Sequence, residues 1–207
     1  MKVLLINGSP HSKGCTFTAL SAVEDELKNN GVETEILHIG NKDIRGCIGC
    51  YKCREIGRCV FGNDIVNEAV KKFETADGLV VGSPVYYAGA NGTLVSFLDR
   101  LFFSAQFPKR FKVGAAVVSA RRMGTTAALD QLNKFFLHGE MPVVSSRYWN
   151  AVHGNSPEEV LKDEEGMQVM RYLGRNMAFL ISAICNERSR SGLPAEEPKR
   201  ISTNFIR

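Results

Sequence analysis

Residues 3–16 read Val-Leu-Leu-Ile-Asn-Gly-Ser-Pro-His-Ser-Lys-Gly-Cys-Thr and mark the step from a strand into a helix. The four apolar residues at the start are typical of a short strand that is buried on both faces of a parallel sheet. Small and hydroxylated residues then predict a turn, and residues 16–30 have helical character up to Gly31, a typical helix stop. A strand of this kind that leads directly into a helix predicts an α/β fold.

The same succession of strand and helix continues along the whole chain. We expect strands at residues 3–6, 33–39, 79–82, 113–119 and 143–148, and helices at 16–30, 64–74, 94–101, 128–136 and 170–184. This alternation predicts a doubly wound, five-stranded parallel sheet with helices on both faces, in the flavodoxin-like order 2-1-3-4-5. Ligands of such sheets bind outside the carboxyl ends of the strands.

Length and composition narrow the class of protein. The 207 residues suit one domain over residues 1–188 with a cysteine-containing loop at 45–62, followed by an extended C-terminal arm at 189–207. The net charge of +4 is spread along the chain, without the clustered basic face that nucleic-acid binding needs. The first apolar run is too short for a signal peptide and no segment is long enough for a membrane span, so we expect a cytoplasmic protein.

Three loops should emerge at the carboxyl edge of this sheet. Residues 7–16 open a helix, where backbone N–H groups and the helix dipole favour a phosphate, although an ordinary turn has a similar composition. The loop is neither a Walker A motif nor a G-x-G-x-x-G motif. Tyr86 and Tyr87 in the second loop can offer ring faces to a flat heterocycle. Arg121 and Arg122 in the third loop can meet an anionic ligand or simply be solvated.

Taken together, the loops resemble the NADPH-dependent FMN reductase group of flavodoxin-like proteins. The matching motifs are Asn-Gly-Ser-Pro-x3-Gly-x-Thr at residues 7–16, Gly-Ser-Pro-Val-Tyr-Tyr at 82–87 and Phe-Leu-Asp-Arg at 97–100. The resemblance covers roughly residues 1–150 and implies FMN, with its phosphate on residues 9–16 and its ring against residues 84–88. The cofactor-binding residues that it implies are Ser9, His11, Lys13, Gly14, Cys15, Thr16, Phe17, Pro84, Val85, Tyr86, Tyr87, Ala88, Asn91, Gly92, Ser119, Ala120, Arg121, Arg122 and Gly124.

Four of the six cysteines lie within thirteen residues, in the spacing C-x2-C-x2-C-x5-C. This spacing is cramped for a pair of zinc knuckles, and a thioredoxin-like dithiol would use only two of the four thiols. Disulfides are disfavoured in a cytosolic protein. A 4Fe–4S cluster needs four thiolates, and ferredoxins supply three of them from a C-x2-C-x2-C run. Spacing alone thus favours a cluster, with zinc and thiol redox chemistry as the alternatives.

The cysteine motif on a flavodoxin-like chain resembles the iron–sulfur flavoprotein family. That resemblance implies a 4Fe–4S cluster near FMN, with Cys47, Cys50, Cys53 and Cys59 as its ligands. Because the loop follows the second expected strand, we expect it at the same edge as the flavin site.

The expected function is that of an FMN-dependent oxidoreductase that passes electrons between the cluster and FMN. We assign no catalytic side chain, because the flavin itself carries the chemistry and no Ser/His/Asp triad is recognisable. NAD(P)H or ferredoxin would donate electrons, and a small molecule would accept them. The resemblance implies a homodimer or homotetramer.

Two alternatives to this function stay open. One is a cluster-free NAD(P)H-dependent FMN or quinone reductase, whose cysteines are free or transiently oxidised. The other belongs to a different class: a non-enzymatic electron carrier or a zinc-binding module. The sequence also leaves open whether Trp149 covers a neighbouring flavin or packs at the end of a strand.

Overall fold

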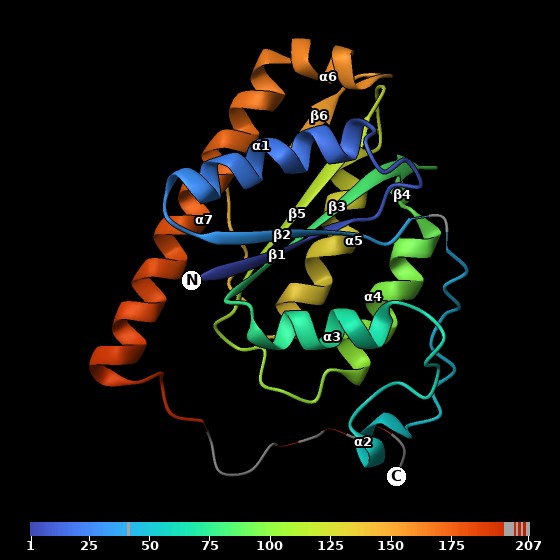
Figure 1. The fold of residues 1–207 in the computed structure, drawn as a ribbon, viewed down its shortest axis with the longest axis vertical. Helices are drawn as coiled ribbons and strands as arrows, with labels where there is room; N and C mark the ends of the chain where they lie inside the picture. Colours follow the sequence, from blue (N-terminus) through green and yellow to red (C-terminus); the bar gives the residue numbers. More distant parts are fainter. Residues whose placement is uncertain (41, 197–200, 202, 204, 206–207) are drawn as a thin grey trace.

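The computed structural model describes residues 1–40, 42–196, 201, 203 and 205, and it has a parallel sheet at its centre (Figure 1). Five parallel strands pair in the order β2-β1-β3-β5-β6. Their bounds are β1 Lys2–Asn7, β2 Glu33–His38, β3 Gly78–Tyr86, β5 Val113–Ala120 and β6 Ala151–His153; the short β4, Gly89–Ala90, pairs antiparallel with the end of β3. In sequence order of the parallel strands, this is the predicted order 2-1-3-4-5.

Helices cover both faces of the sheet, as predicted (Figure 1). One face carries α1 (Cys15–Asn29), α6 (Pro157–Lys162) and α7 (Glu164–Ser191), and the other carries α3 (Val66–Thr75), α4 (Gly92–Ser104) and α5 (Thr125–His138). Residues of β1 alternate between the two cores: Val3 and Leu5 pack with α1 and α7, whereas Leu4 and Ile6 pack with α3 and α4. All four are fully buried, which explains the uninterrupted apolar run in the sequence.

The prediction of a fifth strand at residues 143–148 is wrong. This segment pairs with the sheet only at one isolated bridge, between Val143 and Gly114. The Oγ atom of Ser146 donates to the carbonyl of Tyr148 and the side-chain oxygen of Asn150, so the chain turns away from the sheet. It returns as β6, where the N–H of Val118 in β5 donates to the carbonyl of Asn150 at 3.0 Å. Polar side-chain bonds within the segment thus compete with the ladder.

The apolar stripe at residues 170–184 is part of the longer helix α7, which packs against α1 and the sheet. Met170, Leu173 and Met177 are fully buried, so the stripe belongs to the core. The boundary expected at residue 188 falls inside this helix, which ends at Ser191 with Gly192 as its C-cap. The expected arm lies partly outside the described residues. Within the described part of the chain, no helix combines the length and apolarity that a membrane span requires.

Candidate functional site

The loops after β1, β3 and β5 meet at the carboxyl edge of the sheet and are tied together by hydrogen bonds. The N–H of Gly8 donates to the carbonyl of Gly82 at 2.9 Å, which joins the first loop to β3. The hydroxyl groups of Thr16 and Ser119, both buried, lie 2.8 Å apart and join α1 to the end of β5. These bonds place the three predicted loops around one region at the sheet edge.

The first loop is held in shape by Asn7, which is completely buried. Its side-chain oxygen accepts from the N–H of Ser9 at 3.1 Å, and its amide donates to the carbonyl of Ser12 at 3.1 Å. His38 at the end of β2 bonds the carbonyl of Ser9 at 2.8 Å. The loop therefore keeps its curvature through its own polar contacts.

Helix α1 begins at this loop without a side-chain cap, since its N-cap residue is Gly14. The N–H groups of the first turn and the positive end of the helix dipole therefore face the loop without a capping side chain, as in anion-binding helix starts. Residues 10–15 line an open hollow at this position, and Lys13 is exposed there. The thiol of Cys15 contacts the carbonyl of Gly154 at 3.7 Å, and burial raises its pKa.

Sequence reasoning missed the other wall of this hollow, which consists of Asn155, Ser156 and Pro157. These residues lead into α6, whose N-cap is Ser156; its hydroxyl accepts from the N–H of Glu159 at 3.3 Å. The pattern Ser-Pro-Glu-Glu at residues 156–159 is a helix-start signal that could have located the helix. Its place opposite the first loop depends on the tertiary structure.

The second loop combines two rigid positions with two exposed rings. The backbone N–H of Asn91 donates to the hydroxyl of Ser83 at 2.9 Å, and its side chain caps α4 through the N–H of Leu94 at 3.2 Å. Tyr86 and Tyr87, which precede the short β4, are both exposed at the tip. Tyr87 also has a positive φ of 50°, which residues other than glycine rarely adopt.

The third loop contacts the second at Gly124, which has φ = 93°. A Cβ atom at this position would lie 2.8 Å from the Cα of Ala88. Arg121 and Arg122 are exposed on the same loop, while Ser119 is buried against Thr16. The structure thus brings the loop backbones together and leaves the two arginines at the surface.

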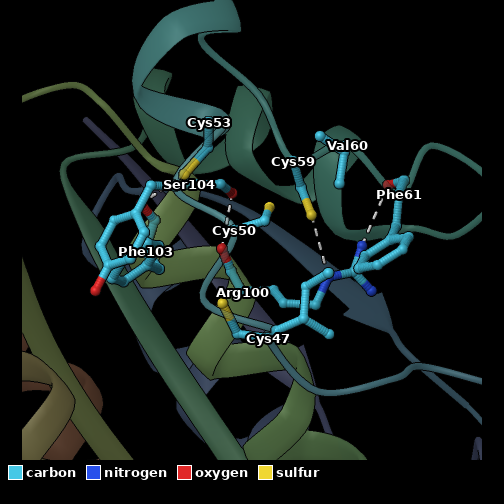
Figure 2. A pocket seen from close by; sticks show the side chains of 11 residues that line it. Cys47, Cys50, Cys53, Cys59, Val60, Phe61, Arg100, Phe103 and Ser104 are labelled. Atoms are coloured by element: carbon cyan, nitrogen blue, oxygen red, sulfur yellow. Dashed lines mark hydrogen bonds between the residues drawn. The ribbon is translucent and has the colours of Figure 1, made fainter.

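The four clustered cysteines line one small cavity (Figure 2). Cys47 and Cys50 are exposed, Cys53 is buried and Cys59 is half-buried. The thiol of Cys53 contacts the carbonyl of Phe103 at 3.7 Å, and the sulfur of Cys59 accepts from the Nε atom of Arg100 at 3.3 Å. Phe103 and Arg100 belong to α4, so this helix forms one wall of the cavity.

The backbone of the cysteine loop is shaped by residues with positive φ angles and by hydrogen bonds from a side chain of α3. Gly49 and Gly57 have φ of 62° and 68°, and Gly57 ends the short helix α2, Cys53–Ile56. Asn67 in α3 clamps Cys59: its side-chain oxygen accepts from the N–H of Cys59 at 2.9 Å, and its amide donates to the carbonyl at 3.1 Å. The sulfur atoms are thus held on a defined backbone, which a metal centre requires.

The donor set suits a soft, cationic group. Burial raises the pKa of the Cys53 thiol, and the charges of Cys50, Cys47 and Cys59 raise it further. Four thiolates in one cavity therefore need positive charge between them, and thiolates are the ligands of iron–sulfur centres. Among the described residues, no three His, Cys, Asp or Glu side chains are placed to hold a single metal ion. All four sulfur atoms line the same cavity, which is compatible with a metal centre bound through thiolates.

The location of the cysteines differs from the expectation. Figure 1 shows the segment after β2 leaving the sheet edge and running to α2, at the far end of α4. Helix α4 begins at Gly92, beside the second loop, and its Phe103 and Ser104 line the cysteine cavity. Eleven residues of α-helix span about 17 Å. Ile44, which is buried in the core, holds the segment on this path.

Proteins of known family are similar to this chain over most of its length. A model of the family described as NADPH-dependent FMN reductase matches residues 1–156. An iron–sulfur flavoprotein of Methanocaldococcus jannaschii is 34% identical over 192 residues, which cover 89% of this chain and 99% of the relative. An iron–sulfur flavoprotein of Methanosarcina thermophila is 28% identical and covers 92% of this chain and 100% of the relative.

Solved structures at low identity match the fold. RosB, solved with 8-demethyl-8-formylriboflavin-5'-phosphate, has a TM-score of 0.71 at 16% identity and covers 100% of this chain and 93% of its own. A flavodoxin from the domain Archaea has a TM-score of 0.61 at 16% identity and covers 88% of this chain and 99% of its own. These matches agree with the predicted flavodoxin-like sheet.

Proposed function

The chain belongs to the NADPH-dependent FMN reductase family and is a flavin-dependent oxidoreductase, and from this premise we propose that it also binds a 4Fe–4S cluster and passes electrons between cluster and flavin. The observation that carries the proposal is the single cavity lined by Cys47, Cys50, Cys53 and Cys59. Relatives of this chain that cover almost its whole length are named iron–sulfur flavoproteins.

We propose that FMN binds at the carboxyl edge of the sheet, with its phosphate at the start of α1 and its ring beside residues 84–88. The uncapped first turn of α1, the exposed Lys13 and the hollow opposite Ser156 support a phosphate at this place. Tyr86 and Tyr87 supply aromatic surface for the ring, and the loop with Arg121 and Arg122 lies next to them.

FMN supplies one- and two-electron chemistry when bound, and a 4Fe–4S cluster supplies one-electron transfer. The chain's own residues would then bind and orient these groups. Asn7 and Ser83 hold the loop backbones, while Asn67 holds Cys59 in the cysteine loop.

We further propose NAD(P)H as the donor at the flavin and an acidic carrier protein such as ferredoxin as the partner at the cysteine loop. Cys47 and Cys50 are exposed, so a partner can approach the cluster directly. The exposed side chains around them include more cations (Lys52, Arg54 and Arg58) than anions (Glu55), which attracts an acidic protein. A small molecule is the proposed final acceptor, and a homodimer or homotetramer is the proposed assembly.

Anaerobic purification followed by iron, sulfide, zinc and FMN analysis tests the proposal. We expect about four iron and four sulfide atoms per chain, together with FMN. Protein that holds FMN but no iron or sulfide, and that cannot be reconstituted, would leave the cluster-free reductase as the function. Zinc without sulfide would favour the zinc-binding alternative for the cysteine loop.

A further inference from the structure

Arg100 is the largest side chain that the fold buries completely, with 1% of its surface exposed. It lies in the C-terminal half of α4, and its guanidinium group reaches the cysteine cavity (Figure 2). A buried charge is costly unless it is paired and hydrogen-bonded, so its partners indicate why it is there.

Every nitrogen of this guanidinium has a partner, and one partner is a cysteine sulfur. Both terminal nitrogens donate to the carboxylate of Asp64, and they also reach the carbonyls of Arg45 at 3.4 Å and Phe61 at 3.2 Å. The remaining nitrogen, Nε, donates to the sulfur of Cys59 at 3.3 Å. The Phe61 ring lies against the group, with its centroid 5.2 Å from Cζ.

These contacts join α4 to the cysteine loop and to the residues directly after it, which lie 36 to 55 positions earlier in the sequence. Arg45, Cys59 and Phe61 belong to the cysteine loop, and Asp64 precedes α3, where it accepts from the N–H of Val66 at 3.1 Å. The guanidinium keeps its charge because arginine is effectively always protonated in proteins and because the carboxylate of Asp64 pairs with it. The group therefore stays charged beside the sulfur.

A fixed cation beside a ligand sulfur raises the reduction potential of a cluster. Reduction adds one negative charge to the cluster, and hydrogen bonds to its sulfurs and nearby positive charge stabilise that charge. The low dielectric of a buried site strengthens the effect, and the negative charge of Asp64 opposes it.

Resting on the cluster-binding function proposed above, we propose that Arg100 is a positioning residue that orients Cys59 and raises the reduction potential of the cluster. Asp64 holds Arg100 in place and moderates its charge. In the step concerned, an external one-electron donor transfers one electron to the cluster. No bond forms or breaks, and Arg100 keeps its proton.

The test is a reductive titration of the reconstituted full chain with dithionite and mediators, followed by EPR. Arg100→Gln removes the charge and keeps N–H donors, so the midpoint should move to a more negative potential. Asp64→Asn keeps the shape and removes the opposing charge, so the midpoint should move to a more positive potential. Arg175→Gln changes the net charge equally but lies in the ion pair with Glu26 on the other face of the sheet, so it should leave the midpoint unchanged.

A double variant keeps the test valid if Arg100→Gln does not fold. Removal of one partner of a buried ion pair is strongly destabilising, whereas removal of both is often tolerated. The double variant Arg100→Gln/Asp64→Asn should therefore fold and bind iron. The midpoint potential of its cluster should be more negative than that of the wild type.

Two outcomes separate this inference from the proposed function. Suppose that the wild-type protein holds a cluster, but that the midpoint moves in the same direction in both single variants or moves in neither. That result would overturn the role of Arg100, because a purely structural role predicts no opposite shifts. Wild-type protein without iron and sulfide would overturn the cluster itself.

Discussion

Cys53 is the residue on which the proposed cluster depends most directly, because it is the buried member of the four. We predict that Cys53→Ala lowers the iron content from about four atoms per chain to almost none, since one corner of the cluster loses its ligand. FMN content should change little, because the cysteine cavity and the proposed flavin position lie at opposite ends of α4.

Cys185→Ala is the matched control, since this half-buried thiol lies on α7, where it contacts Asp77 at 3.8 Å. The control should keep its iron. Loss of FMN together with iron in Cys53→Ala would contradict the separation of the two sites.

Gly124 is a second residue with a specific backbone role. Its φ is 93°, and a Cβ atom added to it would lie 2.8 Å from the Cα of Ala88. We therefore predict that Gly124→Ala lowers the free energy of unfolding by about 1–3 kcal/mol. FMN affinity should fall as well, because the second and third loops would be pushed apart. Urea unfolding and FMN fluorescence titration measure the two effects.

Gly92→Ala is the control for this substitution, because a Cβ at Gly92 has no atom within 4 Å. Its effect on unfolding should stay within about 0.5 kcal/mol. An equal loss of stability in both variants would show that the contact between the two loops is not the cause.

Helices α1 and α7 are joined by an ion pair on one face of the sheet. They pack along the face opposite the cysteine cavity and are joined by an ion pair in which Arg175 donates to both oxygens of Glu26, at 2.9 and 3.0 Å. The bond to Arg175 lowers the pKa of Glu26 below its ordinary value of 4.5, although burial acts in the opposite direction.

The lowered pKa of Glu26 predicts a pH-dependent contribution to stability. A carboxyl group with a depressed folded-state pKa stabilises the fold above its unfolded pKa and loses this effect as the pH falls through the folded value. Glu26→Gln should therefore have a slightly lower urea midpoint than the wild type at pH 7, and the two midpoints should converge in acid. A difference that is constant with pH would assign the effect to packing.

Helix α4 connects the two sites at the level of elements. Asn91 caps its first turn beside the second loop, and Arg100, Phe103 and Ser104 near its other end face the cysteines. One rigid element thus sets the distance between the proposed flavin and cluster positions within a chain.

The charges on the surface of the molecule predict how the rate of its reaction with a carrier protein depends on salt. Reduction of the cluster by an acidic one-electron carrier should slow as the ionic strength rises, because screening weakens its attraction to the cations around Cys47 and Cys50. Arg58→Glu should slow this reaction further at low salt, as measured by stopped-flow absorbance. Arg190→Glu, at the end of α7, should not. Equal rates for all three proteins at every salt concentration would rule out electrostatic docking at the cysteine loop.

The sequence by itself determined the layered architecture and the set of chemical groups. The uninterrupted apolar run of residues 3–6 indicates a strand covered on both faces, and the stripe of α7 indicates a helix with one buried face. The alternation of such strands and helices predicted the sheet order and both helical layers. The spacing of the four cysteines and the small residues of the first loop are also local signals, and the structure brings each set together.

Only the tertiary structure decided where irregular segments run. Residues 143–148 have a strand-like composition, yet bonds within the segment lift them from the sheet. The cysteine loop has no periodicity, and its path depends on contacts such as that of Arg100 with Cys59, which lie 41 residues apart. Such contacts depend on how whole elements pack, because a loop without its own repeat takes the course along which its buried and polar groups find partners. The cysteine site therefore lies at the far end of α4, away from the sheet edge at which we propose that the flavin binds.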